Sequence, residues 1–337
     1  MLVRDFTDGL EVDQVLLVRQ VEVRAKRDGA EYLKITFADR TGSVCAMVWE
    51  GVAQVRSVCV PGTAVVVVGR FSVHPRYGGQ LALRALRPPV EGTYCLEDLC
   101  DGPPRSAELM EADLRELVAT VQDPWLRRLL DRLLGPGTPT WAQFREAPAA
   151  KHYHQAYRHG LLEHCLSVAQ GVSAISATFG GVDRDVAITG ALLHDIGKLE
   201  AYTDDPLCID LTDHGKLQGE IPLGYYRVPR EIEAIAGFPA ATAAAVGHII
   251  LSHHGTLEHG SPVVPCTREA TLVHFLDNLG GRLGSFDRLE KELPAGSAWS
   301  SFDRAIGSGA FFGFAAAAAA AGAAEDGQHA EPHRQAA

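Results

Sequence analysis

The chain of 337 residues lacks any run of about 20 strongly apolar residues, which excludes a transmembrane helix. Its longest apolar stretch follows Phe314 and is mostly alanine, which is too weakly apolar to span a bilayer. The first residues contain no apolar segment of the signal-peptide kind. The seven cysteines are odd in number and form no CxxC pair, which argues against a disulfide framework and a cysteine-rich zinc site. We therefore expect a cytoplasmic protein with reduced thiols and no membrane partner.

Several common catalytic patterns are also missing. The sequence has no GxxxxGK[ST], no HExxH and no GxSxG, and strands do not alternate regularly with helices, so a doubly wound sheet is not indicated. Negative charge exceeds positive charge, and the net charge is −11. This balance argues weakly against a general nucleic-acid coat. The charge is uneven, at +3 over residues 1–90 and −14 over the remainder. An acidic region that handles a polyanion would need bound cations.

Strand patterns dominate residues 12–90. Tyr32–Phe37 alternates cleanly, with Leu33, Ile35 and Phe37 on one face. Four further runs are typical of strands: Val12–Arg24, Ser43–Trp49, Thr63–Phe71 and Gln80–Leu86. Five strands in about 80 residues predict a small closed barrel, for which the OB-fold, an oligonucleotide-binding barrel, is the commonest candidate.

The rest of the chain is patterned mainly as helices. Pro88-Pro89 closes the barrel unit, and helical spacing then begins near residue 106. We predict four segments: a barrel over 1–90, a helical linker over 91–147, an all-α domain over 148–314 and a disordered, alanine-rich tail over 315–337.

Histidine is concentrated in the helical half, where 13 of the 14 histidines lie between residues 152 and 333. Several stand beside carboxylates on apolar helices: Glu163-His164, His194-Asp195, His248 with His253-His254, and Asp277. A single histidine on such a face is usually a core residue, but four sites in order point to a shared partner. Buried imidazole and carboxylate groups need partners, and one metal ion satisfies all of them. Imidazole and carboxylate without thiolate suit Mn, Fe, Co, Ni or Zn.

The order His…His-Asp…His…Asp resembles that of the HD-domain metal-dependent phosphohydrolases. Four segments resemble more closely the YhaM-type 3′→5′ exoribonucleases: His154–His164, Leu192–Lys198, His248–Gly255 and Phe275–Leu279. That family also places an OB domain before the HD domain. The resemblance implies a multidomain α and β protein, with a five-stranded OB-like β-barrel followed by an all-α HD domain. It also implies hydrolysis of single-stranded RNA, or DNA, to nucleoside monophosphates.

The resemblance further implies a set of metal ligands. His164, His194, Asp195 and Asp277 match the core set of the family, and Asp195 is placed to bridge two ions. Two ions would activate a water molecule and stabilise the attacking and leaving oxygens of a phosphodiester. Lys198, one turn beyond Asp195, would hold a phosphate oxygen as a point charge, with a solvated helix-end lysine as the alternative.

One position departs from the family pattern. The family usually shows Gly-His-Ile after the HD motif, whereas this chain has Gly219-Glu220-Ile221. Glu220 as an oxygen ligand would favour a harder ion such as Mn, with Co, Mg, Fe, Ni or Zn as alternatives. A degraded second site with one remaining ion is the other interpretation. We assign Glu220 and His253 to the second ion, with His248, His254 and His214 as alternates for metal or phosphate.

The barrel carries candidate RNA-binding residues. We expect Tyr32, Lys34, Arg70 and Tyr77 to be exposed and to bind single strands by stacking and charge. The alternation also allows Phe37 and Trp49 to be core residues, and the barrel to serve contacts in a homo-oligomer instead.

Two rival functions remain open. One is hydrolysis of a nucleotide or cyclic nucleotide, although the GYP extension of cyclic-dinucleotide HD enzymes is absent after His254. The other is a nucleic-acid-binding regulator with an impaired HD site, a hypothesis that Glu220 motivates.

Overall fold

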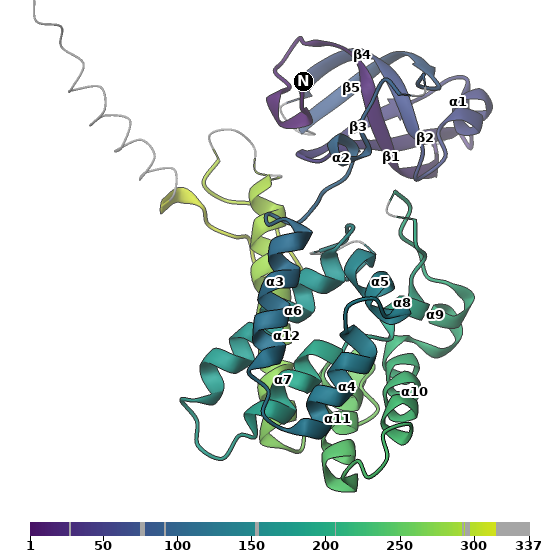
Figure 1. Cartoon of the computed structure of the whole chain (residues 1–337). Coiled ribbons are helices and arrows are strands. Elements are labelled where there is room, and N and C mark those ends of the chain that lie inside the picture. Colours follow the sequence, from purple (N-terminus) through teal and green to yellow (C-terminus); the bar gives the residue numbers. More distant parts are fainter. Residues whose placement is uncertain are drawn as a thin grey trace, which may run out of the picture. The chain divides into compact units, whose positions relative to one another are not determined.

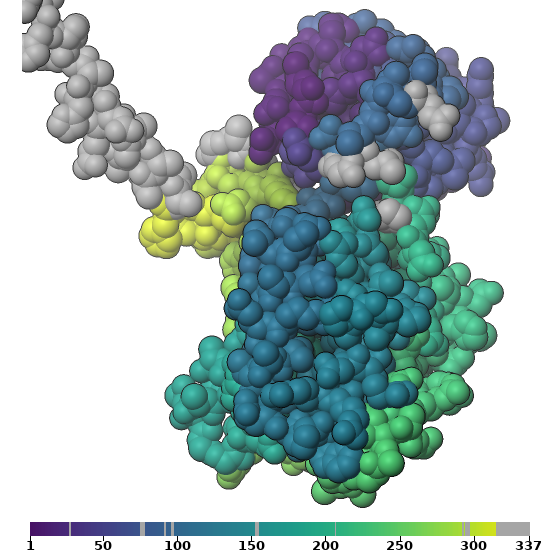
Figure 2. Space-filling model, in the orientation of Figure 1, coloured from purple at the N-terminus to yellow at the C-terminus, as the bar shows by residue number. Residues whose placement is uncertain are grey.

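The computed structural model describes residues 1–26, 28–74, 78–90, 92–151, 155–205, 207–291, 293 and 297–314. By internal contacts the chain divides into residues 1–284 and residues 285–337. The first unit contains a β-barrel and a group of helices. Each forms a rounded body of its own in the space-filling view, the barrel in purple to blue and the helices in teal to green (Figure 2).

Five strands close the N-terminal barrel in the order β1-β2-β3-β5-β4 (Figure 1). The strands are β1 Glu11–Ala25, β2 Glu31–Asp39, β3 Gly42–Val48, β4 Ala64–His74 and β5 Gly78–Arg87. Three short helices accompany them: η1 Val3–Asp5, α1 Val52–Val58 and α2 Leu96–Leu99. All neighbouring strands pair antiparallel except β3 and β5, which pair in parallel. This confirms the predicted five-stranded OB-like barrel.

The barrel core follows the alternation of β2. Leu33, Ile35 and Phe37 are fully buried, while Tyr32 and Lys34 on the opposite face are half-buried. The register of β1 against β2 shifts between Val18 and Gln20. Such a bulge reverses the inside–outside pattern of the strand, so the simple alternation expected along β1 does not continue past it.

The remaining elements are helices. They are α3 Ala107–Ala119, α4 Pro124–Leu134, α5 Pro139–Glu146, α6 Gly160–Ser176, α7 Arg184–Leu193, α8 Lys198–Ala201, α9 Asp213–Gln218, α10 Glu220–Glu233, α11 Ala240–Ser252, η2 Leu257–His259 and α12 Arg268–Lys291. Several of these helices are preceded by an N-cap residue whose side chain accepts a hydrogen bond. Ser106, Asp123, Thr138 and Asp183, for example, each accept a hydrogen bond from a backbone N–H of the first turn.

The helices share one hydrophobic core. Met110 and Leu114 of α3 and Phe144 of α5 are buried in the same cluster as Leu162 of α6 and Leu192 of α7. The segment predicted as a linker therefore contributes a layer of the helical core. The elements from α3 to α12 are all helices, so the all-α prediction is confirmed.

The smaller unit begins inside α12. Two isolated bridges follow the helix, Trp299 with Phe311 and Asp303 with Ser308. Arg288 donates a hydrogen bond to Asp303 at 2.5 Å. The segment predicted as a disordered tail, 315–337, lies outside the described residues. Among the described helices, none combines the length and apolar character needed to cross a bilayer.

Candidate metal centre

Three helices bring the predicted core ligands together. His164 lies on α6, His194 and Asp195 follow α7 directly, and Asp277 lies on α12. The His164 Nε2 atom is 3.1 Å from His194 Nε2, 3.2 Å from an Asp195 carboxylate oxygen and 3.1 Å from one of Asp277. His253, which follows α11, lies with its Nε2 3.5 Å from the other Asp195 oxygen. Five residues from four separate parts of the chain thus form one buried cluster.

These side chains form two overlapping groups whose ligand atoms lie within 4.8 Å of one another. The groups are His164, His194 and Asp195, and His194, His253 and Asp277. No other such group occurs in the part of the chain that the structure describes. The centre therefore contains the predicted core set together with His253.

Backbone carbonyls fix the tautomers of two histidines. His194 donates from Nδ1 to the carbonyl of Ala191 at 2.7 Å, and His253 donates from Nδ1 to the carbonyl of Ile250 at 2.8 Å. A carbonyl can only accept, so each Nδ1 carries the proton and each Nε2 presents a lone pair to the centre. This arrangement is typical of histidines that bind metal.

Two buried atoms of the centre lack hydrogen-bond partners among the described residues. They are the Oδ1 atom of Asp195 and the Nε2 atom of His253, which face each other at 3.5 Å. Both are acceptors, so neither can satisfy the other, and leaving them unpaired inside the protein is costly. A divalent cation would satisfy both. The residues present therefore fit a divalent metal ion.

The charged groups of the centre shift one another's pKa. Burial alone would lower the pKa of His164, but hydrogen bonds to Asp195 and Asp277 raise it to about 9. Burial would raise the pKa of both aspartates, yet Lys198 and the histidines hold the pKa of Asp195 well below its usual range, and His164 does the same for Asp277. Both carboxylates are therefore ionised at neutral pH, as metal ligands must be.

Lys198 is a buried partner of the centre. Its ammonium donates to an Asp195 carboxylate oxygen at 2.6 Å, and only 14% of its side chain is exposed. The Asp195 carboxylate raises the pKa of Lys198 despite burial, so this residue stays charged. The alternative of a solvated lysine at a helix end is wrong. Lys198 thus lies beside the predicted ligands, and its contact with phosphate stays a prediction.

Glu220 lies at the edge of the centre. It is the first residue of α10, and its carboxylate is 3.6 Å from the Nε2 atom of His254. The approach of α10 depends on Gly197, because a Cβ there would lie 2.0 Å from the Glu220 carbonyl oxygen. Glu220 is in neither of the two ligand groups, but it pairs with His254, whose ring stacks edge-on against His253 at 4.4 Å.

The two remaining alternates lie elsewhere. The Nε2 atom of His248 accepts a hydrogen bond from the backbone N–H of Cys266 at 2.8 Å, so this histidine anchors the loop that follows η2. His214 is exposed on α9, where its Nδ1 lies 3.3 Å from the amide of Gln218. Neither belongs to a ligand group among the described residues.

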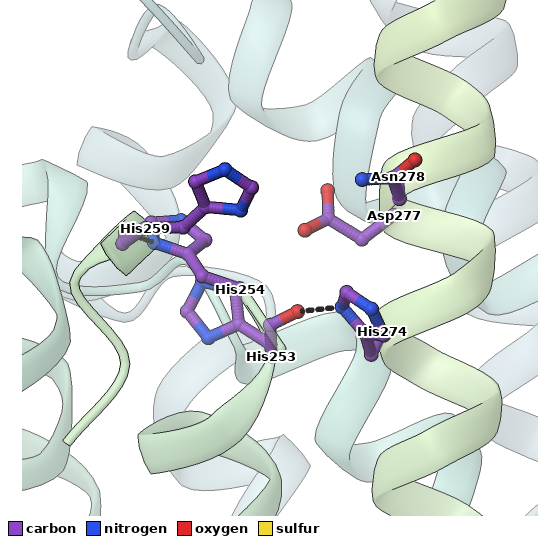
Figure 3. A pocket seen from close by; sticks show the side chains of 6 residues that line it. All are labelled: His253, His254, His259, His274, Asp277 and Asn278. Carbon is purple, nitrogen blue, oxygen red and sulfur yellow. Dashed lines mark hydrogen bonds between the residues drawn. The ribbon is translucent and has the colours of Figure 1, made fainter. Parts of the chain in front are cut away.

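A cavity of about 280 Å³ opens beside the centre (Figure 3). Its lining residues are His253, His254, His259, His274, Asp277 and Asn278. Figure 3 shows the Asp277 carboxylate pointing toward the histidines across the cavity. The sequence reasoning missed His259, His274 and Asn278. His274 precedes Asp277 by three residues on one helix, a spacing that places both on one face and could have revealed it.

Gln155 is a further residue that the sequence reasoning missed. Its side-chain oxygen lies 3.1 Å from the Nδ1 atom of His164. It stands inside the segment that resembles the family motif, which was the available signal.

The barrel presents a ring pair on the outer face of β2 and β3. Tyr32 and Trp49 stack with centroids 4.5 Å apart, and the ammonium of Lys26 lies 5.6 Å from the Trp49 ring. Trp49 is 53% exposed, so its assignment as a core residue is wrong, whereas Phe37 is core.

The residues predicted for this surface differ in their surroundings. Two of them are half-buried rather than exposed as expected: Tyr32, on which the Trp49 ring stacks, and Lys34, whose ammonium lies 3.2 Å from Glu22. Arg70 is exposed on β4, as expected. Tyr77 lies outside the described residues.

Comparison with known proteins agrees with this centre. The model of the HD domain matches residues 161–281, which contain all five converging residues. The fold and the site thus define an HD-domain protein in which a barrel precedes the helices along the chain.

Relatives cover almost the whole chain. The 3'-5' exoribonuclease YhaM of Geobacillus sp. (strain WCH70) is 31% identical over 289 residues, which cover 85% of this chain and 87% of the relative. The protein of the same name from Bacillus subtilis (strain 168) is 29% identical over 288 residues, covering 85% and 90%. The chain therefore belongs to the YhaM family of 3′→5′ exoribonucleases, and the resemblance read from the sequence is confirmed.

Proposed function

We propose that this protein is a metal-dependent 3′→5′ exoribonuclease that shortens single-stranded RNA and releases nucleoside monophosphates. The observation that carries the proposal is the buried His–Asp centre, in which Asp195 and His253 present partnerless acceptor atoms to each other. Membership of the YhaM family supports the substrate class and the direction. The same proposal places the enzyme in the cytoplasm, with RNA as its partner.

In this proposal His164, His194, Asp195 and Asp277 hold the first ion. Bound divalent metal would supply an activated water molecule and neutralise charge on the phosphate. The chain's own groups orient the site. The carbonyls behind His194 and His253 fix the rings, and Lys198 holds the Asp195 carboxylate in place at 2.6 Å. Lys198 would also present a fixed positive charge toward the phosphate.

A second ion is the finer part of the proposal. We assign it to the free oxygen of Asp195, to His253 and to Glu220, with His254 beside Glu220 as the alternate. An oxygen ligand at this position favours Mn over softer ions.

Glu220 can be tested by changing its charge and its ligand type. Glu220→Gln should lower the affinity for one ion of the pair, and Glu220→His should shift the preference toward Co or Ni, which favour imidazole. The measurement is the number of ions per chain during titration with Mn and Co. Two ions bound with unaltered affinity in Glu220→Ala would remove Glu220 from the site.

The barrel would guide the RNA. Exposed aromatic rings and neighbouring cations are the means by which such barrels hold single strands. Tyr32 and Trp49 supply the rings, Lys26 and Lys34 lie close to them, and Arg70 adds charge on β4.

The direct test uses RNA labelled at one end. Incubation of 5′-labelled single strands with the protein and Mn, Mg, Co or Zn should yield a ladder that shortens from the 3′ end. A matched DNA strand tests the breadth of the substrate class, and a cyclic nucleotide tests the rival small-nucleotide activity. Metal-dependent hydrolysis of the small nucleotide with intact RNA would contradict the proposal.

A further inference from the structure

Two polar side chains face the cavity beside the metal centre without any hydrogen-bond partner among the described residues. They are the imidazole of His259 on η2 and the amide of Asn278 on α12. The histidines around them each make a hydrogen bond through Nδ1. His274 donates to the carbonyl of His253 at 2.7 Å (Figure 3), and His254 donates to the carbonyl of His259 at 2.9 Å. The side chains of His259 and Asn278 are exposed, so a ligand in the cavity can reach both.

The chemistry of this lining selects the kind of group that would bind there. No lysine or arginine lines the cavity. An amide and a neutral imidazole each offer a donor and an acceptor, which is also what a hydroxyl group offers. The lining therefore matches sugar hydroxyls better than it matches a second phosphate.

The size of the cavity suits a single nucleoside. Its volume of about 280 Å³ lies just below the range of about 300–1,000 Å³ for small-molecule sites. Asp277, a ligand of the proposed metal site, forms part of the same wall. A nucleoside seated here would place its 5′ phosphodiester at the centre, which is the bond that a 3′→5′ exonuclease cuts.

We propose that this cavity holds the 3′-terminal nucleoside of the substrate, and that His259 and Asn278 bind the hydroxyl groups of its ribose. The inference rests on the proposed exoribonuclease function and adds the feature by which the enzyme reads a strand end. The 2′- and 3′-hydroxyls share this chemistry, so the test separates them.

The test uses four RNA strands that differ only at the last sugar, which is ribose, 2′-deoxyribose, 3′-deoxyribose or 2′,3′-dideoxyribose. The measured quantity is kcat/KM for removal of that last nucleotide. Wild-type protein should act on the dideoxy end about tenfold more slowly than on the ribose end, because the hydrogen bonds to the missing hydroxyls are lost. The two singly deoxy ends show which hydroxyl is read.

Two variants tie this preference to the residues. Asn278→Ala and His259→Ala should each slow removal of the ribose end while leaving the rate on the dideoxy end unchanged, so that the ratio falls toward one. Glu258→Ala and Arg282→Ala, exposed neighbours outside the cavity lining, should keep the wild-type ratio. The content of bound metal is measured in every variant.

The possible outcomes separate this inference from the function on which it rests. Equal wild-type rates on the ribose and dideoxy ends would overturn the inference, as would an equal slowing of both ends in His259→Ala with full metal content. Wild-type protein that shortens none of the four strands would instead contradict the proposed exoribonuclease function.

Discussion

At the scale of single residues, Asp195 connects every part of the candidate centre. One of its oxygens is within 3.2 Å of His164 and 2.6 Å of Lys198, and the other faces His253. Its side chain is 1% exposed. In the proposed two-ion site this carboxylate would help to hold both ions, so its loss would release both.

We predict that Asp195→Asn loses hydrolysis and bound metal while staying folded. Asparagine keeps the size and an acceptor for Lys198, whereas alanine would leave a buried ammonium without its partner, which is strongly destabilising. Removing a residue behind a metal ligand commonly weakens binding by about 10–100-fold, so loss of a ligand itself should cost about 100-fold or more. Elemental analysis, activity and thermal unfolding are measured together.

The matched control for this variant is Asp204→Asn, which changes an exposed aspartate. It should keep wild-type metal content and activity. A folded Asp195→Asn protein with full activity would disprove the assignment of the centre.

His164 makes metal binding sensitive to pH. In the metal-free protein its pKa is raised to about 9, so its ring is protonated at pH 7–8 and must lose that proton before it can bind an ion. We predict release of a proton from His164 on metal binding at pH 7.5, and an affinity that rises about tenfold per pH unit up to about pH 9. Calorimetric titration in buffers of different ionisation enthalpy measures this release.

The same shift affects the stability of the metal-free protein, and its sign follows from linkage. A raised pKa means that the folded state holds the proton more tightly than the unfolded state does. The resulting stabilisation is complete below about pH 6.5 and is lost as the pH rises through about 9. Affinity for metal that stays flat between pH 7 and 9 would contradict the protonated state of His164.

At the scale of elements, the outer face of β2 and β3 combines two rings with positive charge. The pairing of Leu33 with Val48 fixes the strand register, so Tyr32 and Trp49, one residue away on each strand, come into contact. The sequence indicated the inward face of β2 correctly, because strict alternation reports which side is buried. It did not decide the side of Trp49, because that residue lies just beyond the end of β3, where alternation stops being informative.

We predict that Trp49→Ala weakens binding of single-stranded RNA without lowering the rate on a short substrate. Stacking of one base on an aromatic side chain contributes about 1–3 kcal/mol, so Kd should rise by about 5- to 100-fold. Phe179→Ala is the matched control, since Phe179 is 61% exposed and belongs to the helical part of the chain. Fluorescence anisotropy with labelled RNA makes the comparison. An unchanged Kd in Trp49→Ala would remove the ring pair from the RNA-binding surface.

At the scale of the whole molecule, the buried apolar residues form two separate hydrophobic cores. One fills the barrel and the other joins α3–α7 with the later helices. The sequence indicated the barrel and the helical half, because local alternation and helical spacing report them directly, and its motif order pointed to residues that the structure brings together. It could not indicate that α3–α5 belong to the second core, because their helical spacing shows an apolar face without naming its partner. Nor could it show that Lys198 points at Asp195, which depends on the turn after α7.

This division predicts where the chain can be cut. A chain that begins at Pro103 keeps α3, α4 and α5 and therefore the whole second core. It should fold, bind metal and hydrolyse a short phosphodiester. It should bind long single-stranded RNA more weakly and with a smaller dependence on salt, because the phosphate contacts of the barrel are gone.

A chain that begins at residue 148 loses Met110, Leu114 and Phe144, which exposes the apolar surfaces that they cover. It should therefore aggregate or unfold at lower temperature. Thermal unfolding of both chains, with RNA affinity at two salt concentrations, provides the measurement. Undiminished affinity for long RNA in the chain from Pro103 would show that the barrel does not guide the substrate, and a stable, metal-binding chain from residue 148 would show that α3–α5 are dispensable to the second core.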